Sequence, residues 1–385
     1  MRKYNVSTTR RPRLDALSMP MGSTHTTVPR STHPISVPAQ WPAQLPAKIA
    51  FVAEAPSDEE VERGIPLIGP SGRVFDSMLR TAGLDRSNYL ITNVFDQKLP
   101  DNDVKNWCAP MGEARAGGFT DIPPIEEAGF LRPEYRHHLT RLQEELEICR
   151  PNVIVPLGGT ALWALTGDAA ITAHRGSITQ AKRLVPGAKL LPTFHPALVI
   201  RQWKFFSVVV GDFVKAHTQS LLGPQITYPT RNLLLEPDLN DIRTFIPRLL
   251  KSSLLSVDIE TGWGQITSVG FAPDAENAIC IPFLDKRTVH RNYWPTTAEE
   301  VEAWKLVREV MESDTPKLGQ NFGGYDAFWF MLKKRIKPMN FIHDTRLLHH
   351  ALYPELPKDL EFMGASYSTQ GAWKNWGRHK EKKDD

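Results

Sequence analysis

The sequence predicts an α/β protein with two domains, and three observations support this. The chain has 385 residues, enough for two domains of ordinary size. With 41% hydrophobic and 23% charged residues, it has the composition of a soluble globular protein. Apolar runs alternate with helical patterns along most of the chain. We expect a disordered basic arm at 1–45, domains at 46–222 and 237–372, a linker at 223–236 and a charged tail at 373–385.

The first 45 residues differ in composition from the rest of the chain. They contain six Lys or Arg residues and one acidic residue, Asp15, and they are rich in Ser, Thr and Pro. This composition is typical of disordered segments, and its positive charge is compatible with nucleic acid as a partner. The chain has no run of ~20 apolar residues and no signal-peptide core, so no membrane partner is expected.

The first domain is expected to be a mostly parallel sheet with helices on both faces, because predicted strands and helices alternate. Ligands of such sheets bind beyond the carboxyl ends of the strands. Glu54, Asn93 and His195 each follow or end an apolar run, so we expect them on one rim. The expected strands lie within 48–56, 89–95, 152–158 and 189–196, and the expected helices within 71–84, 137–148, 160–167 and 203–222.

Several short motifs occur in a fixed order within this domain. Residues 54–72 read EAPSDEEVERGIPLIGPSG, and ITNV, PLGGTA, HRGSI and TFHPALVIR begin at residues 91, 156, 174 and 193. The set resembles the uracil-DNA glycosylase superfamily, and most closely its family four. The resemblance implies a three-layer α/β/α fold and excision of uracil from single- or double-stranded DNA.

The resemblance also implies roles for individual residues. Asn93 would read the edge of a flipped uracil, with Leu67 and Ala55 lining the pocket. His195 would stabilise negative charge on the O2 of the departing base. Glu54 would orient the attacking water or stabilise the sugar cation. The residues expected at the DNA backbone are Ser71, Gly72, Arg175 and Gly176.

The chain departs from the family pattern in several places. Ala53 and Ser57 stand where the family has glycines, and Leu67 stands where it has an aromatic residue that stacks on uracil. The cysteine ligands of an iron–sulfur cluster are missing, so no cluster is expected. These departures leave a second hypothesis open, in which a non-catalytic domain binds uracil or DNA and tethers a family A DNA polymerase.

The second domain has a different order of elements. Three short strands precede a helix, a strand and two more helices, which is the order of a ribonuclease H-like domain. The strands are expected at 254–261, 266–273, 278–283 and 317–321, and the helices at 238–252, 297–313, 325–336 and 344–352.

Acidic residues of this domain form a candidate metal site. Asp258 and Glu260 are two apart on one strand and so share a face, and Asp326 begins a helix. Clustered carboxylates suit divalent cations, here Mg²⁺ or Mn²⁺. The motifs DIET and NFGGYD resemble the first two motifs of the 3′–5′ exonuclease domain of family A DNA polymerases. The resemblance makes the three acids metal ligands and places Asn321 and Tyr325 at the DNA end.

The third motif of this exonuclease family has no match after residue 370, so the fourth carboxylate is missing and exonuclease activity is left open. We expect no polymerase domain within these 385 residues. The two resemblances together imply the N-terminal part of a glycosylase–polymerase fusion of the kind expected in bacteriophages. A DNA polymerase polypeptide acting in trans is a candidate partner, and the cytoplasm of a bacterium or of a phage-infected host is the expected location.

Overall fold

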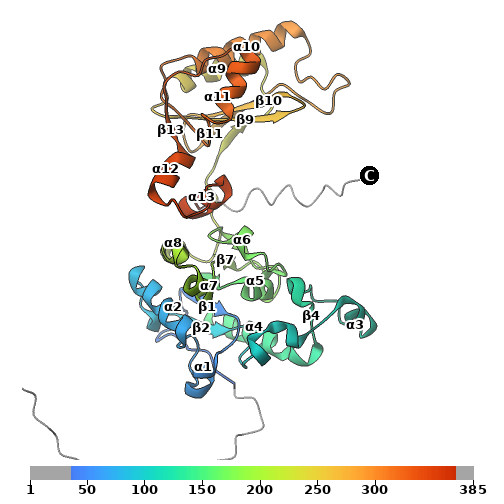
Figure 1. The fold of residues 1–385 in the computed structure, drawn as a ribbon, viewed down its shortest axis with the longest axis vertical. Helices are drawn as coiled ribbons and strands as arrows, with labels where there is room; N and C mark the ends of the chain where they lie inside the picture. Colours follow the sequence, from blue (N-terminus) through green and yellow to red (C-terminus); the bar gives the residue numbers. More distant parts are fainter. Residues whose placement is uncertain (1–35, 370–385) are drawn as a thin grey trace, which may run out of the picture. The chain divides into compact units, whose positions relative to one another are not determined.

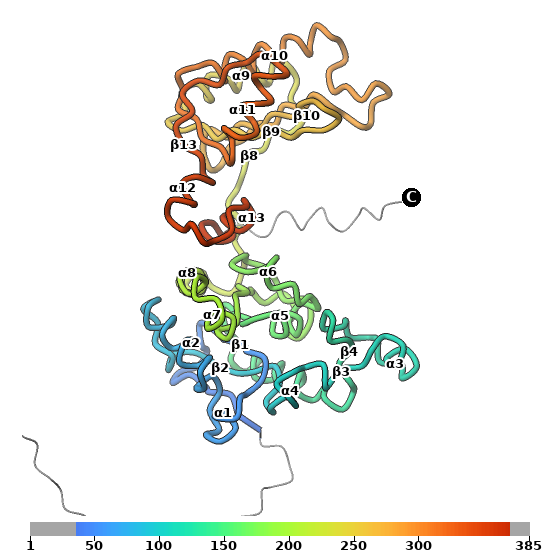
Figure 2. The backbone as a smooth tube through the Cα atoms, viewed as in Figure 1, coloured from blue at the N-terminus to red at the C-terminus, as the bar shows by residue number. Residues whose placement is uncertain are grey.

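The computed structural model describes residues 36–369, which form two successive α/β assemblies along the chain (Figures 1 and 2). Most of the expected arm and all of the expected tail lie outside the described residues. Within 36–369, no helix is long and apolar enough to cross a membrane.

The first sheet has the strand order β2-β1-β5-β7-β6. The first four of these strands run parallel, and β6 runs antiparallel to β7. This confirms the mostly parallel sheet expected from the alternation of strands and helices. The strands are β1 (Ile49–Ala53), β2 (Leu90–Asn93), β5 (Val153–Pro156), β6 (Thr179–Gln180) and β7 (Lys189–Leu190).

Helices cover both faces of this sheet, as the sequence predicted. Alternate residues of β1 belong to two separate core clusters, Ala50 and Val52 to one, Phe51 and Ala53 to the other. The first cluster includes residues of α4 and α5, and the second includes residues of α2, α7 and α8. The result is a three-layer α/β/α arrangement.

The long helices of this domain match the expected segments, whereas the short ones were missed because fewer than two turns leave no periodic pattern. A small antiparallel pair, β3 (Cys108–Ala109) and β4 (Phe130–Leu131), lies between β2 and α4, where no strand was expected. The helices are α1 (Asp58–Arg63), α2 (Pro70–Thr81), α3 (Met111–Ala116), α4 (His137–Cys149), α5 (Gly159–Thr166), α6 (Ile171–His174), α7 (Pro196–Arg201) and α8 (Phe206–Leu221).

The end of the expected disordered arm is ordered in the structure. Gln40 forms an antiparallel bridge with Ile91 of β2, and Val37 is buried. The Val37 N–H also donates to the carbonyl of Asp96 at 2.7 Å. The expectation of disorder up to residue 45 was therefore wrong for residues 36–45. This segment pairs with the edge of the sheet through its backbone, and such pairing leaves no hydrophobic periodicity in the sequence.

The second sheet has the strand order β13-β12-β9-β10-β11-β8. Strands β9, β10 and β11 form an antiparallel meander, and β12 and β13 continue the sheet in parallel on the far side of β9. This confirms the ribonuclease H-like topology. The strands are β8 (Asn232–Leu234), β9 (Leu255–Gly262), β10 (Gln265–Ala272), β11 (Asn277–Pro282), β12 (Lys317–Gly319) and β13 (Phe341–Asp344).

Strand β8 lies inside the segment 223–236 that was expected to be a linker, and it pairs in parallel with β11. Its three residues are too few to give a strand pattern. The core of this domain packs apolar side chains of β9, β10 and β11 against α9 and α10. The helices are α9 (Leu239–Leu250), α10 (Thr297–Met311), α11 (Asp326–Trp329), α12 (Thr345–Leu352) and α13 (Leu360–Tyr367).

Candidate functional site

The carboxyl ends of the parallel strands bring the predicted residues of the first domain to one rim. Ala53 of β1 pairs with Asn93 of β2, so Glu54 follows directly beside Asn93. Beyond β5 and β7, Leu157 bridges to Thr193, two residues before His195. The sequence-based expectation of a shared rim is therefore met by the strand register.

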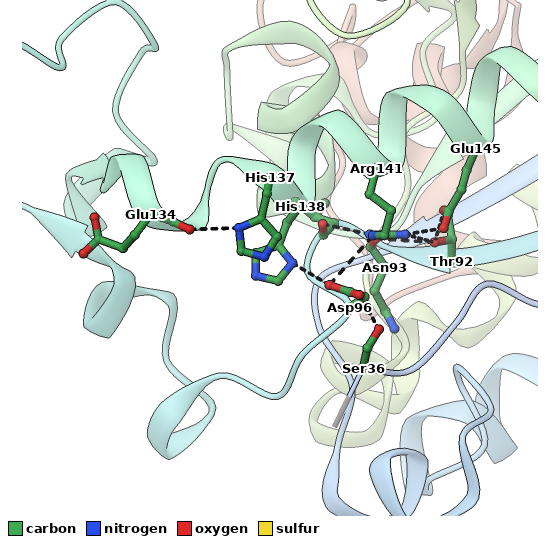
Figure 3. Close-up of polar contacts among 10 residues, drawn as sticks. Ser36, Thr92, Asn93, Asp96, Glu134, His137, His138, Arg141 and Glu145 are labelled. Atoms are coloured by element: carbon green, nitrogen blue, oxygen red, sulfur yellow. Dashed lines mark hydrogen bonds and ion pairs between the residues drawn. The ribbon is translucent and has the colours of Figure 1, made fainter. Parts of the chain in front are cut away.

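Asn93 has a buried amide without a partner among the described residues. It is 2% exposed, and neither its Nδ2 nor its Oδ1 forms a hydrogen bond there. Its backbone is held firmly, since the Arg141 Nη2 donates to the Asn93 carbonyl at 2.6 Å and to the Val94 carbonyl at 3.1 Å (Figure 3). An unpaired buried amide is costly, so a fixed one is a candidate binding group.

A polar network behind β2 holds this strand end (Figure 3). Asp96 bonds the Nδ1 of buried His138 at 2.5 Å, and Arg141 pairs with Glu145. Burial alone would raise the pKa of Asp96, but hydrogen bonds from His138 and Ser36 and the charge of Arg141 hold that pKa well below its usual range. Asp96 is therefore a carboxylate that anchors the segment after Asn93.

Glu54 lies between two strand ends. Its carboxylate accepts a hydrogen bond of 2.6 Å from the hydroxyl of Thr160, in the first turn of α5. Burial raises the pKa of Glu54 above the usual value of 4.5, and the Thr160 hydrogen bond opposes this shift. The side chain is thus a partly desolvated carboxylate with one oriented oxygen.

His195 caps the N-terminus of α7. Its Nδ1 accepts a hydrogen bond of 3.1 Å from the Ala197 N–H, so the neutral ring bears its proton on Nε2. Burial and the nearby charge of Arg201 lower the pKa of His195 to about 4. Gly158 has φ +94°, and a Cβ there would lie 3.1 Å from the His195 Cβ. The His195 ring is therefore neutral and can donate a hydrogen bond from Nε2, and the backbone of Gly158 lies close to it.

Glu60 organises the loop that contains Leu67. Its carboxylate accepts the N–H groups of Ser57 and Gly69, at 3.1 and 3.4 Å, and it is buried. This gives a structural role to an acidic residue of the motif. The Ser57 hydroxyl lies against Gly69, where an added Cβ would be 2.8 Å from the Ser57 Oγ.

The backbone carbonyl of Leu67 is held by a hydrogen bond, and the Leu67 side chain is buried. The Arg86 Nη1 donates to the Leu67 carbonyl at 2.7 Å and to Asp76 at 2.8 Å. An added Cβ at Gly72 would lie 2.0 Å from the same carbonyl, so only glycine fits there. The Leu67 side chain is 2% exposed within the core, together with Phe75. Its contact with uracil, and that of Ala55, stay predictions.

Arg175 lies inside the protein in this structure. It is 2% exposed, and its Nη1 pairs with Asp212 at 3.1 Å. Asp212 also accepts a hydrogen bond of 2.6 Å from Thr193, two residues before His195. The geometry supports a positioning role for Arg175 beneath the rim. Contacts of Ser71, Gly72, Arg175 and Gly176 with DNA stay predictions.

The predicted acids of the second domain are only partly brought together. Asp258 and Glu260 are exposed on the same face of β9, and the Ile259 N–H donates to the carboxylate of Asp326 at 3.1 Å. Burial, and next the charge of Asp258, raise the pKa of Asp326 to about 6. No three Asp, Glu, His or Cys side chains within 36–369 form a group that could hold a metal ion. The donor set does not fit a metal site as it stands.

Asn321 and Tyr325 lie at the start of the segment that leads into α11. The Tyr325 hydroxyl contacts Thr261 of β9 at 2.5 Å, and the Asn321 Oδ1 accepts from Arg346 at 3.0 Å. Asp344 caps α12 and accepts the Asn321 N–H at 3.0 Å. Contacts of Asn321 and Tyr325 with a DNA end stay predictions.

The geometry of the first domain agrees with comparisons to known proteins. The family model of the uracil DNA glycosylase superfamily matches residues 42–214. A type-4 uracil-DNA glycosylase of Thermotoga maritima is 31% identical over 176 residues, which cover 45% of this chain and 77% of the relative. This chain belongs to the uracil-DNA glycosylase superfamily. The membership confirms the resemblance seen in the motifs and assigns the chain to the uracil-DNA glycosylase class of hydrolases.

Two further relatives and one solved structure are similar to parts of this chain. A type-4 uracil-DNA glycosylase of Archaeoglobus fulgidus is 29% identical and covers 44% of this chain and 75% of the relative. A DNA polymerase of Bacillus phage SP01 is 27% identical over 43% of this chain but only 15% of its own length. The Nibbler EXO domain of Aedes aegypti has a TM-score of 0.29 at 13% identity, and the match covers 41% of this chain and 81% of that one. We call residues 42–214 the glycosylase domain below.

Several residues of the glycosylase site were missed from the sequence. Thr160, Arg86 and Arg141 contact Glu54, Leu67 and Asn93, respectively, from distant elements. Each is a single polar residue on a helix or turn, and a single sequence offers no signal for such partners. Thr160 belongs to the PLGGTA motif, but the motif alone indicates no role for its threonine.

Proposed function

We propose that the glycosylase domain binds a uracil flipped out of DNA and hydrolyses its bond to deoxyribose. The observation that supports this most directly is the buried amide of Asn93 at the end of β2, which has no hydrogen-bond partner within residues 36–369. Flipping a base costs about a few kcal/mol, and recognition in the pocket offsets this. An amide that donates to O4 and accepts from N3–H matches uracil, whereas cytosine presents a donor and an acceptor in the opposite positions.

The bond is broken by charge stabilisation at its two ends. As the base leaves with negative charge on O2, the Nε2–H of neutral His195 donates a hydrogen bond to that oxygen. The sugar gains positive charge at the same time. Glu54, with one oxygen held by Thr160, stabilises this cation or orients the water that adds to it. No metal takes part in these steps.

The test is uracil excision by the full chain in excess EDTA. A labelled oligonucleotide with one uracil is incubated with the protein and then treated with alkali, which cleaves at abasic sites. We expect a single break at the uracil, and a loss of about 100-fold or more in rate for Asn93→Ala. EDTA removes any contribution of a metal-dependent nuclease.

A matched control variant distinguishes the loss of uracil recognition in Asn93→Ala from a general loss of folding. Asn106→Ala removes an exposed asparagine amide from the same domain and should excise uracil at the normal rate. An intact strand with wild-type protein, at concentrations that retard the uracil oligonucleotide in a gel, would refute excision and support the non-catalytic alternative. The observation that favours this alternative is the burial of Leu67 in the core, where the family has a stacking aromatic residue.

For the second domain we propose a contribution to DNA binding and no hydrolytic step. The ribonuclease H-like topology and the Asp258–Asp326 proximity support a role on a polynucleotide. Association with a DNA polymerase in trans belongs to this proposal, as does an origin in a bacteriophage. Binding of Mg²⁺ or Mn²⁺ stays a sequence-based prediction, because the acids of this domain do not form a three-ligand group within residues 36–369.

A further inference from the structure

The hairpin between β9 and β10 ends in an exposed tryptophan. Gly262 pairs with Gln265, so the turn consists of Trp263 and Gly264, with φ values of 47° and 75°. A two-residue hairpin turn with both φ positive prefers Asn, Asp or Gly. Trp263 is 64% exposed and so adds little to a core. A bulky aromatic residue at positive φ lowers stability locally, and such outliers indicate function.

An ordered basic loop lies beside this tryptophan. Leu284 and Asn292 form an antiparallel bridge at its base, and the Leu284 N–H donates to the carbonyl of Thr267 on β10. Inside the loop, the Asp285 N–H donates to the Arg291 carbonyl at 3.1 Å. The loop sequence, DKRTVHR, contains three Lys or Arg residues and one acid. The loop therefore presents positive charge from a fixed backbone.

Two of its cations lie over the indole ring. The Lys286 Nζ is 5.5 Å and the Arg291 Cζ 5.7 Å from the ring centroid of Trp263. No salt bridge within residues 36–369 involves either side chain, whereas Arg287 pairs with Asp285 at 2.9 Å and also with Glu236. The one acid of the loop is thus paired with Arg287, while Lys286 and Arg291 place their charges beside Trp263.

A cavity of about 620 Å³ opens at this point. Its wall includes Trp263, Lys286 and Tyr293, together with Thr261 and Glu260 of β9. The volume is in the range of sites that bind small organic groups such as a nucleotide. An aromatic face, cations within reach of it and a hollow of this size form the combination that binds unpaired bases and their phosphates.

We propose that Trp263, Lys286 and Arg291 form a binding site for single-stranded nucleic acid. One unpaired base stacks on the indole, and the adjoining phosphates lie near the two cations. A duplex is excluded from this mode because its base faces are already stacked. The site lies in the second domain and rests on the DNA-binding role proposed for that domain, to which it adds the location and the preference for single strands. The proposed excision of uracil does not depend on it.

The test measures binding of a labelled CACACCACAC decamer by fluorescence anisotropy, with the full chain in EDTA. The decamer has no uracil or thymine, and DNA and RNA versions identify which strand the site takes. Trp263→Asn suits the turn better than tryptophan, so this variant should fold at least as stably. We expect it to bind about tenfold more weakly. Replacing both Lys286 and Arg291 by Gln should lower the slope of log K against log salt by about 1.4.

Two controls make the result specific. Tyr228→Ala removes an aromatic side chain that is also 64% exposed, and it should leave binding unchanged. Trp263→Asn should still excise uracil at the normal rate, so failure here is distinguishable from failure of the proposed function. Unchanged decamer binding by Trp263→Asn, or equally tight binding of a duplex of the same length, would overturn the proposal.

Discussion

Glu54 and His195 are two ionisable residues whose charged forms are both disfavoured by burial. The pKa of Glu54 is raised above 4.5, and the pKa of His195 is lowered to about 4. On acidification Glu54 therefore takes up a proton first, while His195 is still neutral. Since Glu54 acts as a carboxylate and His195 as a neutral donor, we expect the excision rate to fall with decreasing pH through the raised pKa of Glu54.

The measurement is the single-turnover rate of uracil excision between pH 4 and 8, for the wild type and Glu54→Gln. The variant should be slower at neutral pH and should lose this acid limb, because it has no carboxyl group to titrate. An unchanged limb in Glu54→Gln, centred near pH 6.5, would instead mean that an ordinary histidine controls the rate.

The rim residues could be predicted from the sequence because they follow apolar runs, and parallel strands end at one edge. Asn93 and His195 are examples, since the strand register alone places them. Arg175 shows the limit of this reasoning. Its motif pointed to a surface contact with DNA, whereas its guanidinium pairs with Asp212, which is 37 residues away on α8. A pair that forms through tertiary packing leaves no local pattern.

At the scale of elements, the Arg175–Asp212 pair joins the loop after α6 to α8. Both side chains are 2% exposed, and Asp212 also holds Thr193 after β7. Removal of one partner leaves a buried charge, which costs about 3–5 kcal/mol. We expect Arg175→Ala to lower the free energy of unfolding by this amount in urea titrations.

An arginine on the surface serves as the control for the buried Arg175. Arg243→Ala removes an exposed arginine with a salt bridge to Glu302, and it should change stability by less than about 1 kcal/mol. If Arg175→Ala instead leaves stability intact and weakens binding to uracil-free DNA, the guanidinium contacts phosphate in solution, as the motif first suggested.

At the scale of the whole molecule, the two sheets have separate cores. Phe213 of α8 packs against Phe51 and Phe75 in the core of the glycosylase domain, and Phe271 of β10 lies in the core of the second domain. Each side chain is at most 1% exposed. The clusters around the two sheets share no residues, although Leu356 and Phe362 of the C-terminal segment pack into the glycosylase core. Such cores can lose their packing separately, so we expect two unfolding transitions rather than one.

A matched pair of variants tests this division. Phe213→Ala and Phe271→Ala each leave a cavity that costs about 3–5 kcal/mol, and each should shift one transition and spare the other. Uracil excision measured in urea should disappear with the transition that Phe213→Ala shifts, because the Asn93 rim belongs to that core. A single transition moved equally by both variants would show that the domains unfold as one unit, and excision would then depend on the packing of both.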